Sequence, residues 1–266
     1  MRVIKSDFEI IRHRFPGAIK IYPISDVHFG AINCQEKEWT RFCSMILNEP
    51  DAYVLLGGDL LNFNTRSAVG SPFDDTIRPR EQKTRMVEYL EPLVPRILAM
   101  VSGNHERRGL KDADDDPTYD IACKLDIEDI YRQNAAFVTV GLGHKNRSKG
   151  RTNDPWISYN IALTHGAGGG IYTGATVNRN ERWGNLMNAD LVVVGHTHKG
   201  TVTRPSRLLF DSRCDKVMVR EYVVISCVAW QSYGEYSLQK MLLPSQTARP
   251  QVLYLNDRER DIEVRW

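Results

Sequence analysis

The sequence predicts an α/β fold, and three features of the chain support this class. In the first half, short apolar segments of strand length alternate with segments whose apolar residues recur at helical spacing. From about residue 137 onward, most apolar segments have the length and boundaries of strands. Several strands end directly at Asp, Asn or His, where open α/β sheets carry their functional loops. We therefore expect strands and helices to alternate, with the chemistry at one edge of the sheet.

The N-terminal part contains the first strand–helix–strand unit. Residues 1–18 are compatible with a short strand or a short helix, and residues 21–25 form the first clear strand. Residues 34–47 place apolar side chains on one face at helical spacing, before a proline ends the segment. The next apolar segment ends at Leu56 and reads as a buried parallel strand. Such a unit predicts a right-handed parallel crossover.

The alternation continues beyond this unit. Residues 80–94 form a helix that is kinked or ended near Pro92, and residues 97–101 form a strand. Asp116, followed by a proline, is a helix start, and that helix runs to about residue 125. The second half is predicted to hold a helix over residues 178–188 and strands over residues 137–140, 156–163, 191–194, 217–226 and 251–255.

The chemically informative motifs run from residue 26 to residue 198, so no cut divides the chain without dividing them. We therefore expect a single domain over residues 1–266, a length that supports one sizeable core. A long polar segment over residues 63–80 interrupts the pattern. Long loops in compact domains are usually functional or disordered. This segment is a candidate insertion or cap over the site.

Composition and charge exclude several classes. A net charge of +2 is nearly balanced, which argues against a dominant nucleic-acid or acidic-membrane surface. The five cysteines are far apart, so neither a disulfide framework nor a thiolate zinc site is indicated. The charged N-terminus does not resemble a secretory signal, and no segment approaches about 20 apolar residues. We expect a soluble cytoplasmic protein that does not cross a membrane, and its oligomeric state stays open.

One local basic cluster departs from this balance. Residues 144–151 carry four positive charges without an aromatic partner. The favoured interpretation is the solvated tip of a hairpin. The alternative is a loop that contacts the backbone of a nucleic acid.

Metal-ligand residues gather at the ends of five predicted strands. Five of the seven histidines occur there, together with aspartate and asparagine and without cysteine. Hard and borderline donors of this kind suit a pair of divalent ions rather than a structural thiolate site. Manganese is the favoured metal, with iron, zinc and nickel as alternatives. The residues are Asp26, His28, Asp59, Asn104, His105, His165, His196 and His198.

In this order, the motifs resemble the calcineurin-like metallophosphoesterase superfamily. Its pattern of D-x-H, G-D-x-x-D/N, G-N-H-D/E, H and G-H-x-H occurs here complete, from Asp26 to His198. The resemblance implies a four-layer α/β/β/α sandwich of two mixed sheets flanked by helices. It also implies that Asp26, His28 and His198 bind one metal ion, that Asp59 bridges the pair, and that the second ion is bound by Asn104, His165 and His196.

The resemblance further implies how such a site acts. A hydroxide that bridges the two metals would attack phosphorus in line, and the metals would stabilise the phosphoryl oxygens. His105, next to Asn104, would protonate the departing oxygen or hydrogen-bond to a phosphate oxygen. Either Asn62 or a backbone carbonyl would orient His105. The predicted catalytic residues are therefore His105, Asn62 and Asp59.

Departures from subfamily patterns guide the choice of substrate. Asn62 and Phe63 replace the Asp and Arg of the protein serine/threonine phosphatase motif, and no tyrosine occupies the Asn62 position as purple acid phosphatases require. The G-D-x-x-N form is similar to class III phosphodiesterases. The tail from Cys227 to Ser232 resembles the end of the exonuclease-bearing small subunit of archaeal family D DNA polymerases.

The favoured function is therefore a phosphodiesterase that acts on nucleotides or nucleic acid. The alternatives are a phosphomonoesterase for small molecules or phosphoproteins, and a non-catalytic binding subunit of the same fold. Arginines are suited to hold a substrate phosphate by bidentate hydrogen bonds. The candidates are Arg66, Arg78, Arg80, Arg107 and Arg108.

Overall fold

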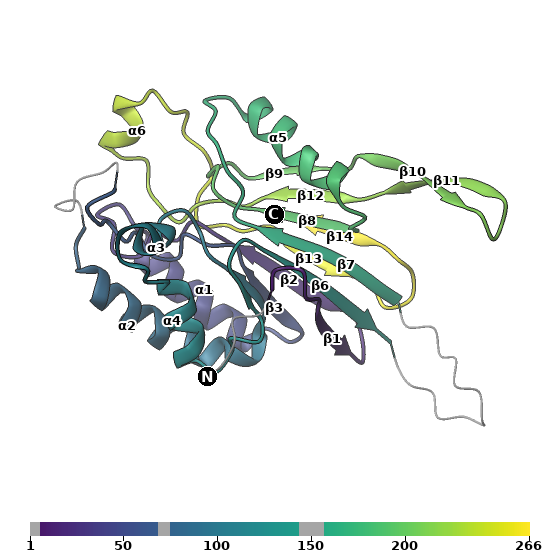
Figure 1. The fold of residues 1–266 in the computed structure, drawn as a ribbon, viewed down its shortest axis with the longest axis horizontal. Coiled ribbons are helices and arrows are strands. Elements are labelled where there is room, and N and C mark those ends of the chain that lie inside the picture. The colour runs from purple at the N-terminus through teal and green to yellow at the C-terminus, as the bar shows by residue number, and fades with distance from the viewer. Residues whose placement is uncertain (1–5, 69–74, 144–156) are drawn as a thin grey trace.

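Two six-stranded mixed sheets lie face to face with helices on their outer sides (Figure 1). The computed structural model describes residues 6–68, 75–143 and 157–266. The arrangement within these ranges is a four-layer α/β/β/α sandwich, which confirms the predicted fold class. The basic cluster 144–151 and residues 69–74 of the candidate cap lie outside the described residues.

One sheet contains the first crossover units. Its strands β2, β3, β4 and β5 are parallel, and β13 joins β2 in the antiparallel direction. Both β3 and β4 are almost entirely buried, which gives the loops that follow them a rigid base. The strand order is β14 (Ile262–Arg265), β13 (Val252–Leu255), β2 (Ile19–Ile24), β3 (Ala52–Leu56), β4 (Ile97–Val101) and β5 (Tyr131–Arg132).

Helices cover the outer face of this sheet (Figure 1). The predicted apolar face of the first helix, from Trp39 to Ile46, is buried against the sheet. The second helix gives way to a 3₁₀ helix, Glu91–Arg96, close to the expected break at Pro92. Asp116 caps the fourth helix by accepting hydrogen bonds from two backbone N–H groups, as predicted. The helices are α1 (Glu36–Asn48), α2 (Pro79–Leu90), α3 (Arg107–Ala113) and α4 (Pro117–Lys124).

The other sheet is built mainly from the second half of the chain, and α5 (Thr173–Leu186) covers its outer face (Figure 1). Strands β7, β8 and β12 are parallel, whereas β6 runs antiparallel to β7, β9 runs antiparallel to β12, and β1 pairs in parallel with β6. The strand order is β1 (Ile11–Phe15), β6 (Ala135–Leu142), β7 (Ile157–Thr164), β8 (Leu191–Val194), β12 (Val223–Ser226) and β9 (Thr201–Thr203).

The predicted strand over residues 217–226 is wrong as one element, because the chain changes partners at Tyr222. Residues Lys216–Glu221 form β11, which pairs with β10 (Ser206–Asp211) in a separate hairpin, whereas β12 enters the main sheet beside β8. The N–H of Tyr222 donates to Pro205 O, beside β10, whereas the N–H of Val223 donates to Asp190 O, beside β8. The chain therefore passes from the hairpin to the main sheet between these two residues.

Other differences concern elements with weak local signals. Residues 1–18 are compatible in sequence with a short strand or a short helix, and the structure shows a strand there, β1. Parallel pairing with β6 stabilises this strand. The helix expected at residues 178–188 begins earlier, at Thr173. The sequence did not predict β5, β9, β10, β14, α3 or the short helix α6 (Glu235–Gln239). These elements are short and depend on pairing or packing with distant residues.

Candidate metal centre

The carboxyl ends of five strands, β2, β3 and β4 in one sheet and β7 and β8 in the other, lead into one cluster of polar side chains. Within each sheet, parallel pairing brings these strand ends to one edge, and the predicted residues that follow the strands lie there. Three overlapping groups have donor atoms within 4.8 Å of one another. The groups are Asp26, His28 and His198; His28, Asp59 and His105; and Asp59, His165 and His196.

The loops that carry these side chains have unusual backbone conformations. Asp26, His28, Asp59, His196 and His198 all have positive φ angles, between 48° and 68°. This left-handed region is uncommon for residues other than glycine, and it is enriched at functional sites where the surroundings hold the strain. All five residues belong to the donor groups, so the unusual backbone coincides with the candidate metal centre.

Close packing between two of the loops requires glycine. A Cβ atom on Gly58, which has a φ of 85°, would lie 2.5 Å from the backbone nitrogen of Gly103. No side chain fits at that distance without moving the backbone. The loops after β3 and β4 can therefore approach closely enough for Asp59 Oδ1 to accept a hydrogen bond of 2.8 Å from the N–H of His105.

The first donor group centres on Asp26. Its Oδ1 lies 3.2 Å from His198 Nε2 and 3.8 Å from His28 Nε2, and the two imidazole nitrogens are 3.1 Å apart. Oδ2 accepts a hydrogen bond from the N–H of His196. Oδ1 is fully buried and makes no hydrogen bond of normal geometry to the described residues. An orphaned buried carboxylate oxygen between two ring nitrogens fits a cation site.

The donor group of Asp59, His165 and His196 fits a cation even more directly. His165 Nδ1 donates to Gly57 O at 2.8 Å, so Nε2 of the neutral ring carries a lone pair. That Nε2 faces two further acceptors, Asn104 Oδ1 at 2.9 Å and Asp59 Oδ2 at 3.2 Å. His196 Nδ1 lies 2.6 Å from the same asparagine oxygen. Three acceptors that converge in this way need a positive charge between them, from a proton or a metal ion.

The pKa values of the cluster also reflect the need for a positive charge between its carboxylates and imidazoles. Burial disfavours the Asp26 carboxylate, but the nearby His198 imidazole outweighs this effect and lowers the Asp26 pKa to about 2. Burial also disfavours the charged form of His165, yet Asp59 prevails and raises the His165 pKa to about 9. The carboxylates thus keep their charge and attract cations to the neighbouring nitrogens.

Asp59 lies between the two groups. Its Oδ2 is 3.2 Å from His165 Nε2, 3.9 Å from His28 Nε2 and 3.9 Å from His105 Nε2. The carboxylate is almost entirely buried. Its position matches that of an anion shared between two cations, which would otherwise repel each other strongly.

His105 stands at the edge of the cluster with a fixed ring. Its Nδ1 donates to the backbone carbonyl of Asn62 at 2.6 Å, so Nε2 is the nitrogen presented to the site. Of the two orienting partners considered from sequence, the backbone carbonyl makes this contact. The side-chain amide of Asn62 instead donates to Asp75 Oδ1 at 2.5 Å.

The five candidate arginines are placed differently from one another. Arg108 lies beside His105 and donates to Asn62 O at 3.3 Å and to Asn64 Oδ1 at 3.0 Å. Arg107 donates to the carbonyls of Ser102 and Gln133, at 3.3 and 3.2 Å. The remaining three arginines of the set, Arg66, Arg78 and Arg80, are exposed.

Sequence reasoning missed the role of Glu106, although this residue completes the G-N-H-E motif. Its buried carboxylate accepts three backbone hydrogen bonds, from Asp59 N at 3.0 Å, Gly103 N at 3.0 Å and Leu61 N at 2.9 Å. Burial, with the nearby Asp59 charge, raises the Glu106 pKa to about 7. Glu106 therefore joins the loops after β3 and β4. Its place in a known motif was the only sequence signal.

We expect Glu106→Gln to lower the free energy of unfolding by about 1–3 kcal/mol, because both carboxylate oxygens accept N–H bonds and an amide must turn its NH₂ toward one of these donors. Urea unfolding measures this change. Glu88→Gln, on the exposed face of α2, is the matched control and should stay within about 0.5 kcal/mol of wild type. Equal stabilities of the two variants would contradict this role for Glu106.

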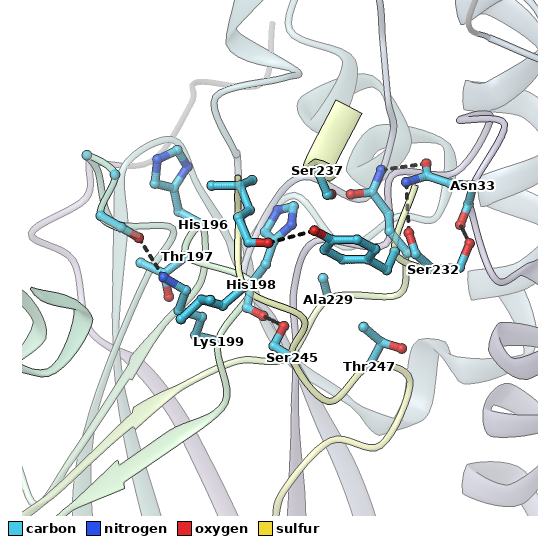
Figure 2. A pocket seen from close by; sticks show the side chains of 17 residues that line it. Asn33, His196, Thr197, His198, Lys199, Ala229, Ser232, Ser237, Ser245 and Thr247 are labelled. Atoms are coloured by element: carbon cyan, nitrogen blue, oxygen red, sulfur yellow. Dashed lines mark hydrogen bonds between the residues drawn. The ribbon is translucent and has the colours of Figure 1, made fainter. Parts of the chain in front are cut away.

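A cavity of about 320 Å³ adjoins the cluster (Figure 2). His196 and His198 line one side of it, and residues of the C-terminal segment 229–247 line another. His105 is not among the residues that line this cavity. The cluster therefore has one flank at His105 and another at the cavity.

The fold and the Asp/His clusters together define the metallophosphoesterase class. The sequence model of the calcineurin-like phosphoesterase family matches residues 19–200, and the chain belongs to this family. The family binds divalent metals, and the clusters described above supply donors for them. None of the helices in the described part of the chain has the length and hydrophobicity of a membrane span.

Solved structures with a similar fold have low sequence identity to the chain. A predicted phosphoesterase from Streptococcus pneumoniae is 12% identical, with 93% of this chain and 88% of that chain covered and a TM-score of 0.39. A metallophosphoesterase from Sphaerobacter thermophilus is 17% identical, with coverages of 89% and 83% and a TM-score of 0.41. A Vps29 double mutant from Entamoeba histolytica is 11% identical, with coverages of 93% and 97% and a TM-score of 0.39. No curated protein matches the chain.

Proposed function

We propose that the protein is a metal-dependent phosphodiesterase that acts on nucleotides or nucleic acid. The observation that carries this proposal is the pair of donor groups that meet at Asp59, where converging carboxylate, amide and imidazole atoms need a positive charge between them. A site of this kind is suited to two divalent ions, and two-ion sites are typical of phosphoryl-ester hydrolysis.

In this proposal, Asp26, His28 and His198 hold one ion and Asp59 is shared. The second ion is held by Asn104, His165 and His196. The donors are imidazole nitrogens and carboxylate or amide oxygens, without thiolate among the described groups. Such a set is compatible with manganese, the favoured ion, and with iron, zinc or nickel. Divalent ions bound there would polarise a phosphoryl oxygen and lower the pKa of a water molecule.

The residues around the donors have distinct tasks. Gly57 O holds the tautomer of His165, and Glu106 holds the loop that carries Asp59. His105, with Nδ1 anchored on Asn62 O, presents Nε2 and in its imidazolium form donates a proton to the departing ester oxygen. Arg108, which shares the Asn62 carbonyl with His105, is the arginine proposed to bind a substrate phosphate.

The two flanks of the cluster favour a diester over a monoester. A diester carries two organic groups on phosphorus. His105 would face the leaving group on one flank, while the cavity beside His196 and His198 offers room for the other group. A monoester would leave that cavity without a role.

The direct test compares hydrolysis of bis(4-nitrophenyl) phosphate and 4-nitrophenyl phosphate by protein loaded with Mn²⁺. The proposal expects a higher kcat/KM for the diester, loss of activity after chelation, and recovery when Mn²⁺ is returned. Rates on single-stranded and duplex DNA then distinguish nucleic acid from smaller substrates. A strong preference for the monoester would overturn the diester assignment, and full activity of metal-free protein would overturn the whole proposal.

A further inference from the structure

The cavity beside the metal centre is formed by segments that are far apart in the sequence. His196, Thr197, His198 and Lys199 follow β8 on one side (Figure 2). Gln231, Tyr233 and neighbouring residues of the C-terminal segment close it from another side. A volume of about 320 Å³ lies at the lower end of the range of small-molecule sites. The group that fits is therefore small, and it adjoins the phosphate position.

Hydrogen bonds hold the walls of this cavity in place. Ser245 Oγ donates to the backbone carbonyl of His198 at 2.7 Å, which joins the C-terminal segment to the metal centre (Figure 2). Ser232 N donates to Asn33 O at 2.9 Å. The walls thus belong to the same framework as the metal-binding loops.

Tyr233 is a fixed aromatic surface in the cavity wall. Tyr233 is 46% exposed, yet its hydroxyl donates a hydrogen bond of 2.8 Å to Leu242 O. The anchored hydroxyl restricts the ring, so little side-chain entropy remains to be lost when a ligand contacts it. An exposed, restricted aromatic ring is the feature on which proteins stack planar bases.

Most of the polar groups in the lining are neutral and can form hydrogen bonds. Its side chains carry hydroxyls and amides, including those of Asn33, Gln231 and Thr247, and none of the described residues that line the cavity carries a carboxylate. Lys199 is the cationic residue of the lining, and its ammonium donates to the carbonyls of Gly170 and Ile171 at 2.5 Å each. Neutral donors and acceptors of this kind match the hydroxyls and ring edges of a nucleoside.

We propose that this cavity binds the nucleoside that remains attached to phosphorus during diester cleavage, with its base stacked on the ring of Tyr233. The proposal rests on the phosphodiesterase function proposed above and adds the position and chemistry of the retained group. Tyr233 is a specificity-determining residue in this scheme, and the departing group lies on the flank of His105.

The test uses two diesters with the same leaving group, thymidine 5′-(4-nitrophenyl) phosphate and methyl 4-nitrophenyl phosphate, and Mn²⁺-loaded protein. We expect wild type to have a higher kcat/KM for the thymidine ester. In Tyr233→Ala, the ratio of kcat/KM for the thymidine ester to that for the methyl ester should fall about 10-fold, mainly through KM, because a stacked base is lost. Free thymidine should inhibit methyl ester hydrolysis by wild type and do so at least several-fold less well in this variant.

Two further variants separate stacking from other effects. Tyr233→Phe keeps the ring and loses the hydroxyl, so its ratio should stay within about twofold of wild type. Phe210→Ala removes an exposed aromatic ring from the β10–β11 hairpin, outside the cavity lining, and should leave the ratio unchanged. Equal falls in Tyr233→Ala and Tyr233→Phe would overturn stacking.

The outcomes also distinguish the two proposals. If neither diester is hydrolysed at any metal loading, the phosphodiesterase function fails. If both diesters are hydrolysed at similar kcat/KM by wild type, the function stands and the nucleoside assignment fails. If Tyr233→Ala keeps the wild-type preference for the thymidine ester, the base does not stack on this ring and the assignment is overturned.

Discussion

Asp59→Asn should reduce kcat/KM for bis(4-nitrophenyl) phosphate by about 10³-fold or more, because it removes the anion shared between the two proposed cations. The substitution keeps the shape of the side chain. Asparagine can still accept the hydrogen bond that His105 N donates to Oδ1, so the fold should survive. The lost charge lies at Oδ2, which faces His165 Nε2 at 3.2 Å.

The measurement combines diester kinetics with elemental analysis of bound metal. The variant should bind fewer than two ions per chain under conditions that saturate wild type. Asp211→Asn, on the β10–β11 hairpin, changes the net charge equally and should alter neither quantity. Near wild-type rates in metal-loaded Asp59→Asn would refute the shared position of Asp59.

His105→Ala should reduce the rate by about 10² to 10⁴-fold while metal content stays at the wild-type level. The imidazole presents Nε2 beside the cluster, but it is proposed to act on the substrate and not on a metal ion. If it donates the proton to the departing oxygen, the loss must depend on that oxygen. A nitrophenolate departs readily without a proton, whereas an alkoxide does not. The decrease should therefore be larger for a dinucleotide than for bis(4-nitrophenyl) phosphate.

A control for this effect is available elsewhere in the chain. His13 lies on β1 and its Nε2 contacts Leu98 O at 2.8 Å, outside the donor groups. His13→Ala should leave the ratio of the two rates as in wild type. An equal loss for good and poor leaving groups in His105→Ala would argue against proton donation and favour a hydrogen bond to a phosphate oxygen.

Much of the fold follows from local sequence patterns. The helix α1 buries the face that its spacing predicts, β4 has the predicted bounds, and Asp116 caps α4 as expected. Errors arose where pairing, not propensity, decides the outcome. β1 is a strand because it pairs with β6, and residues 217–226 divide because Tyr222 and Val223 bond to different parts of the chain.

For the site, the sequence by itself determined which donor residues are available and at which strand ends they lie. The side-chain types and the short apolar segments before them are local properties, and parallel pairing brings such ends to one edge. Only the tertiary structure decided how the donors are held. The carboxylate of Glu106, the carbonyl of Asn62 and the cavity wall around Tyr233 are contacts between distant segments. Such contacts depend on how loops from two sheets and the C-terminal segment pack in space, which no local pattern records.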